Sequence, residues 1–145
     1  MRKQILLLFV VMSFAFAACE EDSDSDAFLY KVPSELEAYV DLHFPEQTII
    51  QAVWDAEGEE SNYELLLDNL TRLEFGLDKK VIEIGGSSKL PDSVIPAGIL
   101  SYISSNYESQ HIIGWELEAG YQQIELNNQL ELEFDMDGKF VRTDD

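Results

Sequence analysis

The chain has 145 residues, a length that fits one ordinary domain or two very small ones. Twenty-nine acidic residues oppose nine basic ones, which gives a formal net charge of −20. A protein this acidic is repelled by nucleic acid and by anionic lipid, so both are excluded as partners. Basic proteins, cationic peptides or divalent cations are the natural ligands, and solubility is the alternative explanation of the same charge.

The first eighteen residues have the anatomy of a secretory signal peptide. Arg2 and Lys3 form a positive start, and residues 5–18 are an apolar run that ends in small side chains. The run is shorter than the roughly 20 residues that a helix needs to cross a bilayer. We therefore expect residues 1–18 to be a signal peptide that is removed on export.

Cys19, the only cysteine, directly follows this segment. Its place after Ala17-Ala18 resembles the lipobox of bacterial lipoproteins, in which the cysteine is acylated, although Phe16 stands where that pattern prefers leucine. Cleavage after Ala17 without acylation is the alternative. We predict lipidation, because a lone thiol has no internal partner in an oxidising compartment and acyl chains give a stable anchor.

Residues 19–29 are predicted to be the lipidated cysteine and an acidic tether. The segment Glu20–Asp26 reads EEDSDSD and has no apolar residue. An acidic run in this place resembles the surface-export signal of lipoproteins in Bacteroidetes-type bacteria, with a plain spacer as the alternative. These features predict an outer-membrane lipoprotein of the bacterial cell envelope, in contact with the membrane only through its anchor, and leave surface or periplasmic exposure open.

Beyond the tether the sequence repeats its own pattern. Residues 32–44 parallel residues 95–107, and residues 73–75 parallel residues 132–134. Each copy opens with a proline followed by apolar residues at helical spacing, and continues with short β-branched and aromatic segments. The pattern predicts two tandem repeats, residues 30–84 and residues 93–145, joined by a linker of residues 85–92.

The predicted fold class is α+β. Each repeat is expected to be one helix followed by a roughly four-stranded antiparallel meander, with the helix packed on the apolar face of the sheet. Residues 130–134 alternate strictly between apolar and acidic side chains, so the other face of the sheet is exposed to water. Whether the sheet is continuous across Gly85-Gly86 stays open.

Several short motifs carry a family resemblance. They are Ile95-Pro96, Tyr102-Ile103, Asn106-Tyr107, Tyr121, Leu132-Glu133-Phe134-Asp135 and Asp137-Gly138-Lys139. Together they resemble the PepSY-like, beta-lactamase-inhibitor-like family of exported Bacteroidetes-type proteins, over roughly residues 30–142. The first copy departs from the pattern at Gly76, where an aspartate is expected. The motifs are structural, so the resemblance supports the fold and implies a binding or inhibitory role only by analogy.

No residue pattern of catalysis is present. The two histidines, His43 and His111, stand where the other copy has Asn106 and Thr48, which is typical of tolerated surface positions. Residues 135–138 fit a turn between strands better than a calcium loop, because the required glycine and glutamate positions are not met. We predict no catalytic residue, no cofactor and no metal site, and therefore a protein that is not an enzyme.

The water-exposed sheet face is the predicted binding site. The alternation sets Glu125 opposite Glu131 and Gln123 opposite Glu133 in one copy, and in the other Glu64 opposite Glu74, with Tyr63 and Phe75 on the core side. Like charges directly opposite each other destabilise a sheet by about 0.2–1 kcal/mol, and a basic partner or a cation would relieve that repulsion. A simply hydrated face is the alternative. The predicted binding residues are Glu125, Glu131, Glu133, Glu64 and Glu74.

The sequence thus predicts a non-catalytic exported module that binds a basic protein partner through an acidic sheet face or through loops, and that inhibits an enzyme or peptidase. The alternatives are a structural or accessory envelope lipoprotein and a weak divalent-cation binding protein.

Overall fold

The computed structural model describes residues 31–55 and 62–144. The predicted signal peptide, Cys19 and the acidic tether lie outside these residues. Within the described ranges, no helix has the length and apolar character needed to span a membrane.

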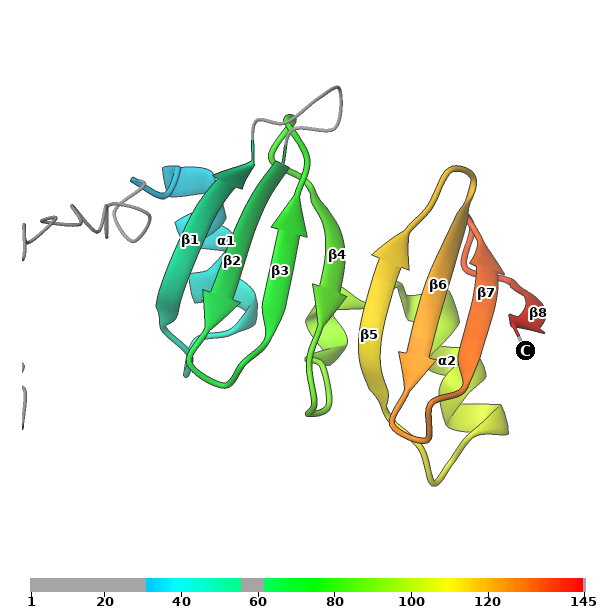
Figure 1. Cartoon of the computed structure of the whole chain (residues 1–145). Helices are drawn as coiled ribbons and strands as arrows, with labels where there is room; N and C mark the ends of the chain where they lie inside the picture. The colour runs from blue at the N-terminus through cyan, green and yellow to red at the C-terminus, as the bar shows by residue number, and fades with distance from the viewer. Residues whose placement is uncertain (1–30, 56–61, 145) are drawn as a thin grey trace, which may run out of the picture.

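The described chain forms two α-helices, one short 3-10 helix and eight strands. In chain order they are α1 (Ser34–His43), β1 (Ile49–Asp55), β2 (Asn62–Leu67), β3 (Arg72–Phe75), β4 (Val81–Gly85), η2 (Asp92–Val94), α2 (Ala97–Asn106), β5 (Ile112–Leu117), β6 (Tyr121–Leu126), β7 (Glu131–Asp135) and β8 (Phe140–Asp144). All eight strands belong to one antiparallel sheet, and their order in the sheet is their order in the chain (Figure 1).

The prediction of two tandem repeats, each a helix with its own four-stranded meander, is wrong. β4 pairs with β5, with Glu83 opposite Glu116 and Ile84 opposite Trp115, so the chain forms one eight-stranded sheet with two short helices. The N–H of Gly86 extends this contact by donating to the carbonyl of Ile113 at 3.0 Å. Two separate sheets would each leave an edge strand with unpaired backbone groups at the junction, whereas the β4–β5 pairing satisfies those groups.

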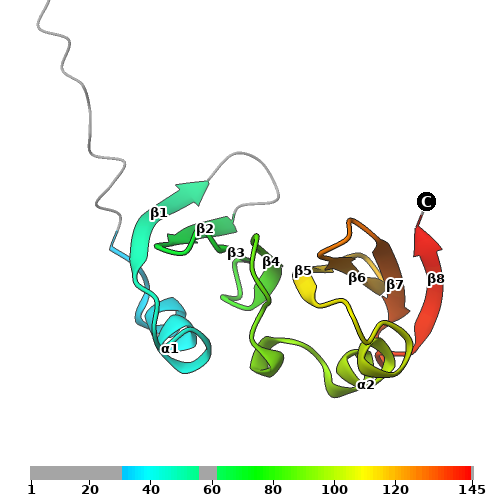
Figure 2. The ribbon, with the colours of Figure 1, turned by 90° about the horizontal axis from the view of Figure 1, so that it is seen from below.

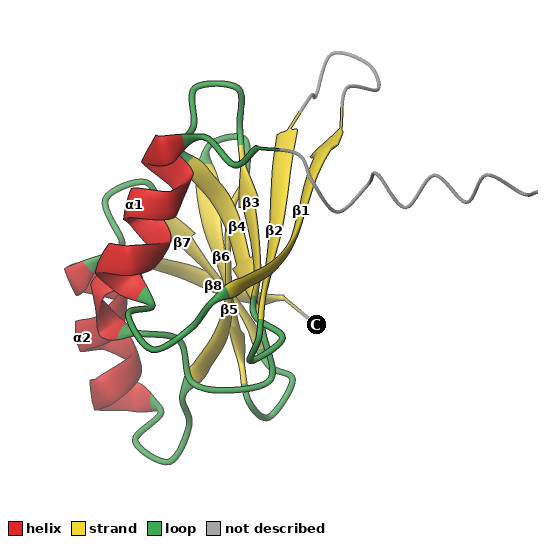
Figure 3. Ribbon diagram, turned by 90° about the vertical axis from the view of Figure 1, so that its left-hand side faces the viewer, coloured by secondary structure: helices red, strands yellow, loops and turns green. Residues whose placement is uncertain are grey.

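The helices lie on one face of the sheet, and the opposite face is open (Figures 2 and 3). α1 covers the first half of the sheet and α2 the second, with η2 between them (Figure 2). Each helix buries two residues that are four positions apart, Leu36 and Val40 in α1, and Ile99 and Ile103 in α2. That spacing places both side chains of a pair on the same side of the helix, facing the sheet.

One hydrophobic core extends under the whole sheet. Its buried residues come from both helices, from the linker and from strands of both halves. Phe75 and Phe134 are both fully buried, and each receives the edge of a helix tyrosine. The ring of Tyr39 lies 5.3 Å from that of Phe75, and the ring of Tyr102 lies 5.4 Å from that of Phe134. The two halves are therefore parts of one packed unit.

The N-terminal end of α2 lies close to the turn between β7 and β8. A Cβ atom at Gly98 would lie 3.1 Å from the carbonyl oxygen of Gly138, which itself adopts a positive φ of 77°. Alanine normally stabilises a helix interior by about 1 kcal/mol relative to glycine. Here we expect Gly98→Ala to lower the free energy of unfolding by about 1 kcal/mol instead, because the backbone of the turn would have to move away. Urea unfolding measures the difference.

Ser101→Ala is the matched control for this prediction, since Ser101 is an exposed position of the same helix. It should leave stability unchanged or raise it slightly. A gain of stability in Gly98→Ala, of the size that helix propensity alone gives, would contradict the close contact.

Candidate functional site

Four glutamates form a continuous row across the open face. The strand register places Glu64 opposite Glu74, Glu74 opposite Glu83, and Glu83 opposite Glu116. We call Glu64, Glu74, Glu83 and Glu116 the acidic row. Directly opposite side chains on neighbouring strands have Cβ atoms about 4.5–5.5 Å apart, so each carboxylate has a like charge beside it.

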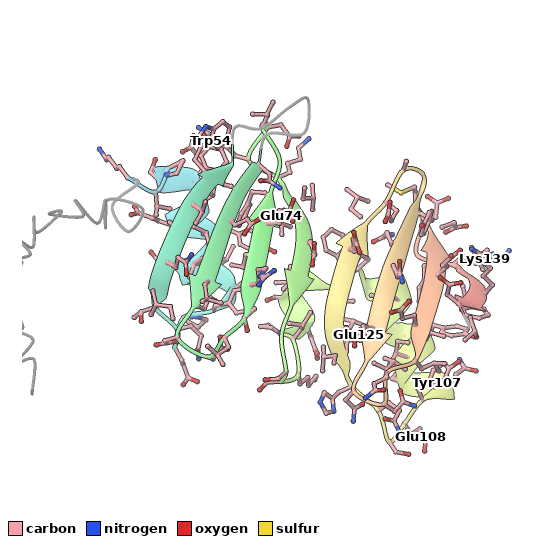
Figure 4. All side chains as sticks on the ribbon, viewed as in Figure 1. Trp54, Glu74, Tyr107, Glu108, Glu125 and Lys139 are labelled. Carbon is pink, nitrogen blue, oxygen red and sulfur yellow. The ribbon has the colours of Figure 1, made fainter. Side chains whose placement is uncertain are left out.

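A hollow interrupts the face next to the acidic row, at the junction of β4 and β5. Gly85 and Gly114 lie opposite each other there. Gly85 leaves the sheet open, whereas the side chain of Glu125 lies over Gly114, where a Cβ atom would be 3.1 Å from the Cβ of Glu125. The hollow has a volume of about 100 Å³. Its walls include five polar side chains, Glu83, Glu116, Gln123, Glu125 and Glu131. Figure 4 shows Glu74 and Glu125 on the face turned away from the helices. This central hollow is therefore an acidic depression in the middle of the open face.

The carboxylates in the middle of the row are only partly compensated. Partial burial is the largest cause that raises the pKa of Glu83, the charges of Glu116 and Glu74 raise it further, and the charge of Arg72 opposes this rise without cancelling it. Partial burial also raises the pKa of Glu116, together with the charges of Glu118, Glu74 and Glu131. Both carboxylates would be more stable beside a positive charge, so the open face has a physical preference for basic ligands.

The predicted pairing register is confirmed. Glu125 lies opposite Glu131 and Gln123 opposite Glu133. In the first half, Glu64 lies opposite Glu74 and Tyr63 opposite Phe75. Four of the five predicted binding residues, all except Glu133, therefore lie exposed or half-buried on the open face, and their role in binding stays a prediction.

Glu133 differs from the other predicted residues. It is only 6% exposed, and the guanidinium of Arg142 on β8 donates to both of its oxygens, at 2.6 Å and 2.8 Å. This hydrogen-bonded ion pair holds the pKa of Glu133 below its usual value. Glu133 therefore stabilises the pairing of β7 with β8. Because its carboxylate is bound to Arg142, it is not free to bind a ligand, although the sequence predicted that it would be.

Sequence reasoning missed Glu83 and Glu116, the two most perturbed carboxylates of the face. Each stands at the polar position of a short strand with apolar neighbours, VIEIG and IIGWEL. That alternation was a usable signal for an outward-facing glutamate. Their juxtaposition depends on the pairing of β4 with β5, which the alternation does not reveal.

The two histidines do not form a catalytic arrangement. His43 Nδ1 lies 3.0 Å from the hydroxyl oxygen of Ser93, a contact that joins α1 to η2. Among the residues that the structure describes, no carboxylate is hydrogen-bonded to this imidazole to orient it as a base. Burial lowers the pKa of His43. The backbone N–H of His111 donates to the side chain of Asn127. In residues 31–55 and 62–144, no three His, Cys, Asp or Glu side chains are grouped to hold a metal ion.

A larger groove lies on the helix side of the sheet, between α2 and the linker. It has a volume of about 640 Å³, and Figure 4 labels Tyr107 and Glu108 at its lower end. Its charged wall residues have both signs, and Lys89 is already paired with Asp92 at 2.8 Å. By volume alone this groove would be the better candidate for a binding site. Its wall residues carry both positive and negative charges, however, so they indicate no particular class of ligand. The open face has the clearer chemistry.

The raised pKa values predict how stability depends on pH. A carboxylate whose pKa is raised in the folded state stabilises the fold fully below its ordinary pKa of 4.5, and this contribution is lost as pH rises through the raised value. We therefore expect Glu83→Gln to raise the melting temperature at pH 7 by about 2–4 °C, and to have little effect near pH 4.5. Thermal unfolding between pH 4.5 and 8 measures the difference from wild type.

His43 acts in the opposite sense, because its lowered pKa costs stability as pH falls below about 6.5. Comparing each variant with wild type at the same pH removes this contribution. Glu46→Gln, at an exposed position in the turn after α1, is the control and should shift the melting temperature at pH 7 much less than Glu83→Gln does. Equal shifts for Glu83→Gln and Glu46→Gln would mean that the acidic row is not repulsive.

The second half of the chain is similar to a known protein family. Residues 81–142 match the family described as "Putative beta-lactamase-inhibitor-like, PepSY-like". The resemblance inferred from the sequence is confirmed over this range, and the family model does not extend over residues 30–80. No curated protein matches the chain.

Three solved structures from Bacteroides share the fold. One, from Bacteroides thetaiotaomicron, is described as a "putative calcium-regulated periplasmic protein"; it is 22% identical, has a TM-score of 0.75, and the match covers 79% of this chain and 91% of that one. Two come from Bacteroides vulgatus and are described as periplasmic proteins, one of the DUF2874 family and one of unknown function. They are 23% and 24% identical, have TM-scores of 0.72 and 0.74, and the matches cover 79% of this chain and 91% and 93% of theirs.

Proposed function

We propose that this chain is a non-catalytic, exported binding module whose open acidic face engages a basic protein partner. The observation that carries the proposal is the acidic row, four adjacent glutamates on an uncovered sheet face, of which Glu83 and Glu116 have raised pKa values. Lysine or arginine side chains of a partner would form charge-assisted hydrogen bonds with these carboxylates.

The central hollow adds shape to this surface. Because Gly85 has no side chain, a basic side chain can reach the sheet there, with the carboxylates of Glu83 and Glu125 in the walls of the hollow. A flat acidic face would attract any cation, whereas a hollow selects a partner that projects a residue into it. The function therefore rests on local geometry as well as on the net charge.

The comparisons support an envelope location for such a module. Three proteins of known structure with this fold are described as periplasmic. Together with the signal-like residues 1–18 and the lipobox-like Cys19, this favours a lipid-anchored protein of the cell envelope. The family match over residues 81–142 makes an enzyme or peptidase the first class of partner to test, with inhibition as the expected effect.

Calcium is the competing ligand, because one structure of this fold is described as calcium-regulated. In the described residues, however, no three carboxylate or imidazole groups are arranged around one ion position. Basic side chains, each of which needs only one or two carboxylates, fit the row better. A rise in melting temperature with millimolar calcium, absent with equal ionic strength of sodium and absent in Glu83→Gln, would favour calcium instead.

The proposal is tested by capture and competition. The immobilised full chain is exposed to envelope and secreted protein extracts, and the retained proteins are eluted with either a lysine homopeptide or a glutamate homopeptide of about ten residues. Release of a specific protein by the lysine peptide alone is the expected result, because that peptide competes for the acidic face. Retention that neither peptide disturbs would show that binding does not use the acidic face.

A further inference from the structure

β1 is an edge strand without the usual protection. Among residues 31–55 and 62–144, its one strand partner is β2, and it forms one rim of the sheet (Figures 1 and 3). Its sequence is IIQAVWD, which contains no proline, lysine or arginine, the residues by which proteins commonly block edge pairing. A register irregularity lies at its start, between Ile49 and Gln51, and the remaining five residues pair regularly with β2.

The hydrogen-bond pattern shows which groups of β1 are left open. The N–H of Leu67 on β2 donates to the carbonyl of Thr71 on the side of β3. Bonding direction alternates along a strand, so the odd-numbered residues of β2 bond toward β3 and the even-numbered ones toward β1. Val53 lies opposite an even-numbered residue and is therefore bonded to β2. Its neighbours Ala52 and Trp54 consequently direct their N–H and C=O groups to the open edge.

The opposite edge of the sheet is less available. β8 has five residues, and two of them, Arg142 and Asp144, are charged. Arg142 is committed to Glu133, and the register shifts between Glu133 and Phe134 beside the start of the strand. Charged residues and irregular pairing both disfavour the addition of a further strand. β1 also has a register shift at its start and ends in Asp55, but its residues 51–54 are uncharged and pair regularly with β2, so β1 is the edge at which another strand can pair.

The surroundings of β1 select the chemistry of such a strand. On the open face, Val53 is short and lies beside Glu64, so a long basic side chain opposite Val53 can extend over it to that carboxylate. On the helix side, Ala52 is buried and Trp54 lies against Tyr63 with 4.2 Å between the ring centroids, so an apolar side chain fits there. A second copy of this chain would instead bring two molecules of charge −20 together.

We propose that the open edge of β1 binds an extended segment of the partner protein in which basic and apolar residues alternate, and that this segment joins the sheet as a ninth strand. Backbone groups of Ala52 and Trp54 supply the pairing, and the acidic face selects the charge. The inference rests on the proposed function, which needs a basic partner. It adds that the partner binds at the edge of β1 and that the bound segment of the partner is extended.

The test uses a peptide of about ten residues in which lysine and valine alternate, added to the full chain. Residue-resolved amide hydrogen exchange should slow about tenfold or more at Ala52 and Trp54, while Val53, already bonded to β2, changes much less. Two N-methylated versions of the peptide, each blocking alternate N–H groups, complete the design. One of them should lose binding and the other keep it, because a strand paired along one edge uses only every second N–H.

Three outcomes would overturn the inference. The first is peptide binding without slowed exchange at Ala52 and Trp54, and the second is equal binding of both N-methylated peptides. Either result leaves a basic partner on the acidic face as the proposed function, so the two failures are distinguishable. The third is a dimer in sedimentation, with these two amides already protected when no peptide is present, which would assign the edge to a second copy.

Discussion

Replacing Glu74, Glu83 and Glu116 together with lysine is expected to weaken binding of the captured partner by about 100-fold or more. These residues supply three of the four carboxylates of the acidic row, and their reversal turns attraction of a basic partner into repulsion at short range. Glu133 is left unchanged, because it is bound to Arg142 and its replacement would test folding rather than binding. Surface plasmon resonance with the partner measures the loss.

The control reverses the same number of charges on the other side of the molecule. Glu37 and Asp41 are exposed on α1, and Glu108 is exposed just after α2. Both triple variants change the net charge equally, so long-range attraction falls equally in both. The control should lose only a small part of the affinity, mostly in the association rate. Equal losses in the two variants would show that net charge, and not the acidic row, determines binding.

A single substitution tests the same surface if the triple variant fails to fold. Lysine at position 83 would lie between Glu74 and Glu116, so Glu83→Lys replaces two repulsive contacts with two attractive ones and turns one attraction, that of Arg72, into a repulsion. This variant should be at least as stable as wild type and should still bind the partner more weakly. If the folded Glu83→Lys protein bound the partner with unchanged affinity, the centre of the acidic row would not be part of the binding site.

Phe134→Ala is expected to destabilise the protein by about 3–5 kcal/mol, the largest loss of stability that we predict. The side chain is fully buried, and its ring lies 5.4 Å from that of Tyr102 and 5.8 Å from that of Phe140. Removing the Phe134 ring leaves a cavity between α2 and the sheet. The rings of Tyr102 and Phe140 could fill this cavity only by giving up their present contacts. Met136→Ala, at a position that is 57% exposed in the next turn, should cost little and serves as the control.

The same variant tests whether the two halves unfold together. Trp54 lies in β1, near one edge, and Trp115 lies in β5, beyond the junction, where its indole N–H donates to Gln122. Because the sheet and the core are continuous, Phe134→Ala should lower the melting temperature reported by both tryptophans equally. Single-tryptophan variants separate the two signals. A transition at Trp54 that stays at the wild-type temperature would mean that the halves unfold independently, against the continuous core.

The pairing of β2 with β3 and of β6 with β7 was accessible from the sequence. Strict alternation in residues 130–134, and the short turns on either side of β6 and β3, fix which residues lie opposite each other, because a slip of one residue would turn the apolar side chains to water. The positions of Glu64, Glu74, Glu125 and Glu131 follow from that constraint alone. The register was therefore predictable for these two regular pairs, whereas the pairs β1–β2, β3–β4, β5–β6 and β7–β8 each carry a register shift that the alternation does not show.

The pairing of β4 with β5 was not accessible in this way. Between them lie the linker, η2 and α2, residues 86–111, and no short turn sets a register across such a connection. The fold prediction failed at this point, and with it the juxtaposition of Glu83 and Glu116. The ion pair of Glu133 and Arg142 was missed for a different reason. A short turn joins β7 to β8, but the register shifts between Glu133 and Phe134, so the alternation alone does not place Arg142 opposite Glu133.

The most direct test of the acidic face as the binding surface is carboxyl footprinting of the complex. Free and partner-bound protein are labelled with a carbodiimide and an amine, and the labelling of each carboxylate is measured by mass spectrometry. Our account predicts that Glu74, Glu83 and Glu116 become protected in the complex, while Glu37 and Asp41 on α1 are labelled as before. Protection of the α1 carboxylates, with the acidic row still fully labelled, would contradict it.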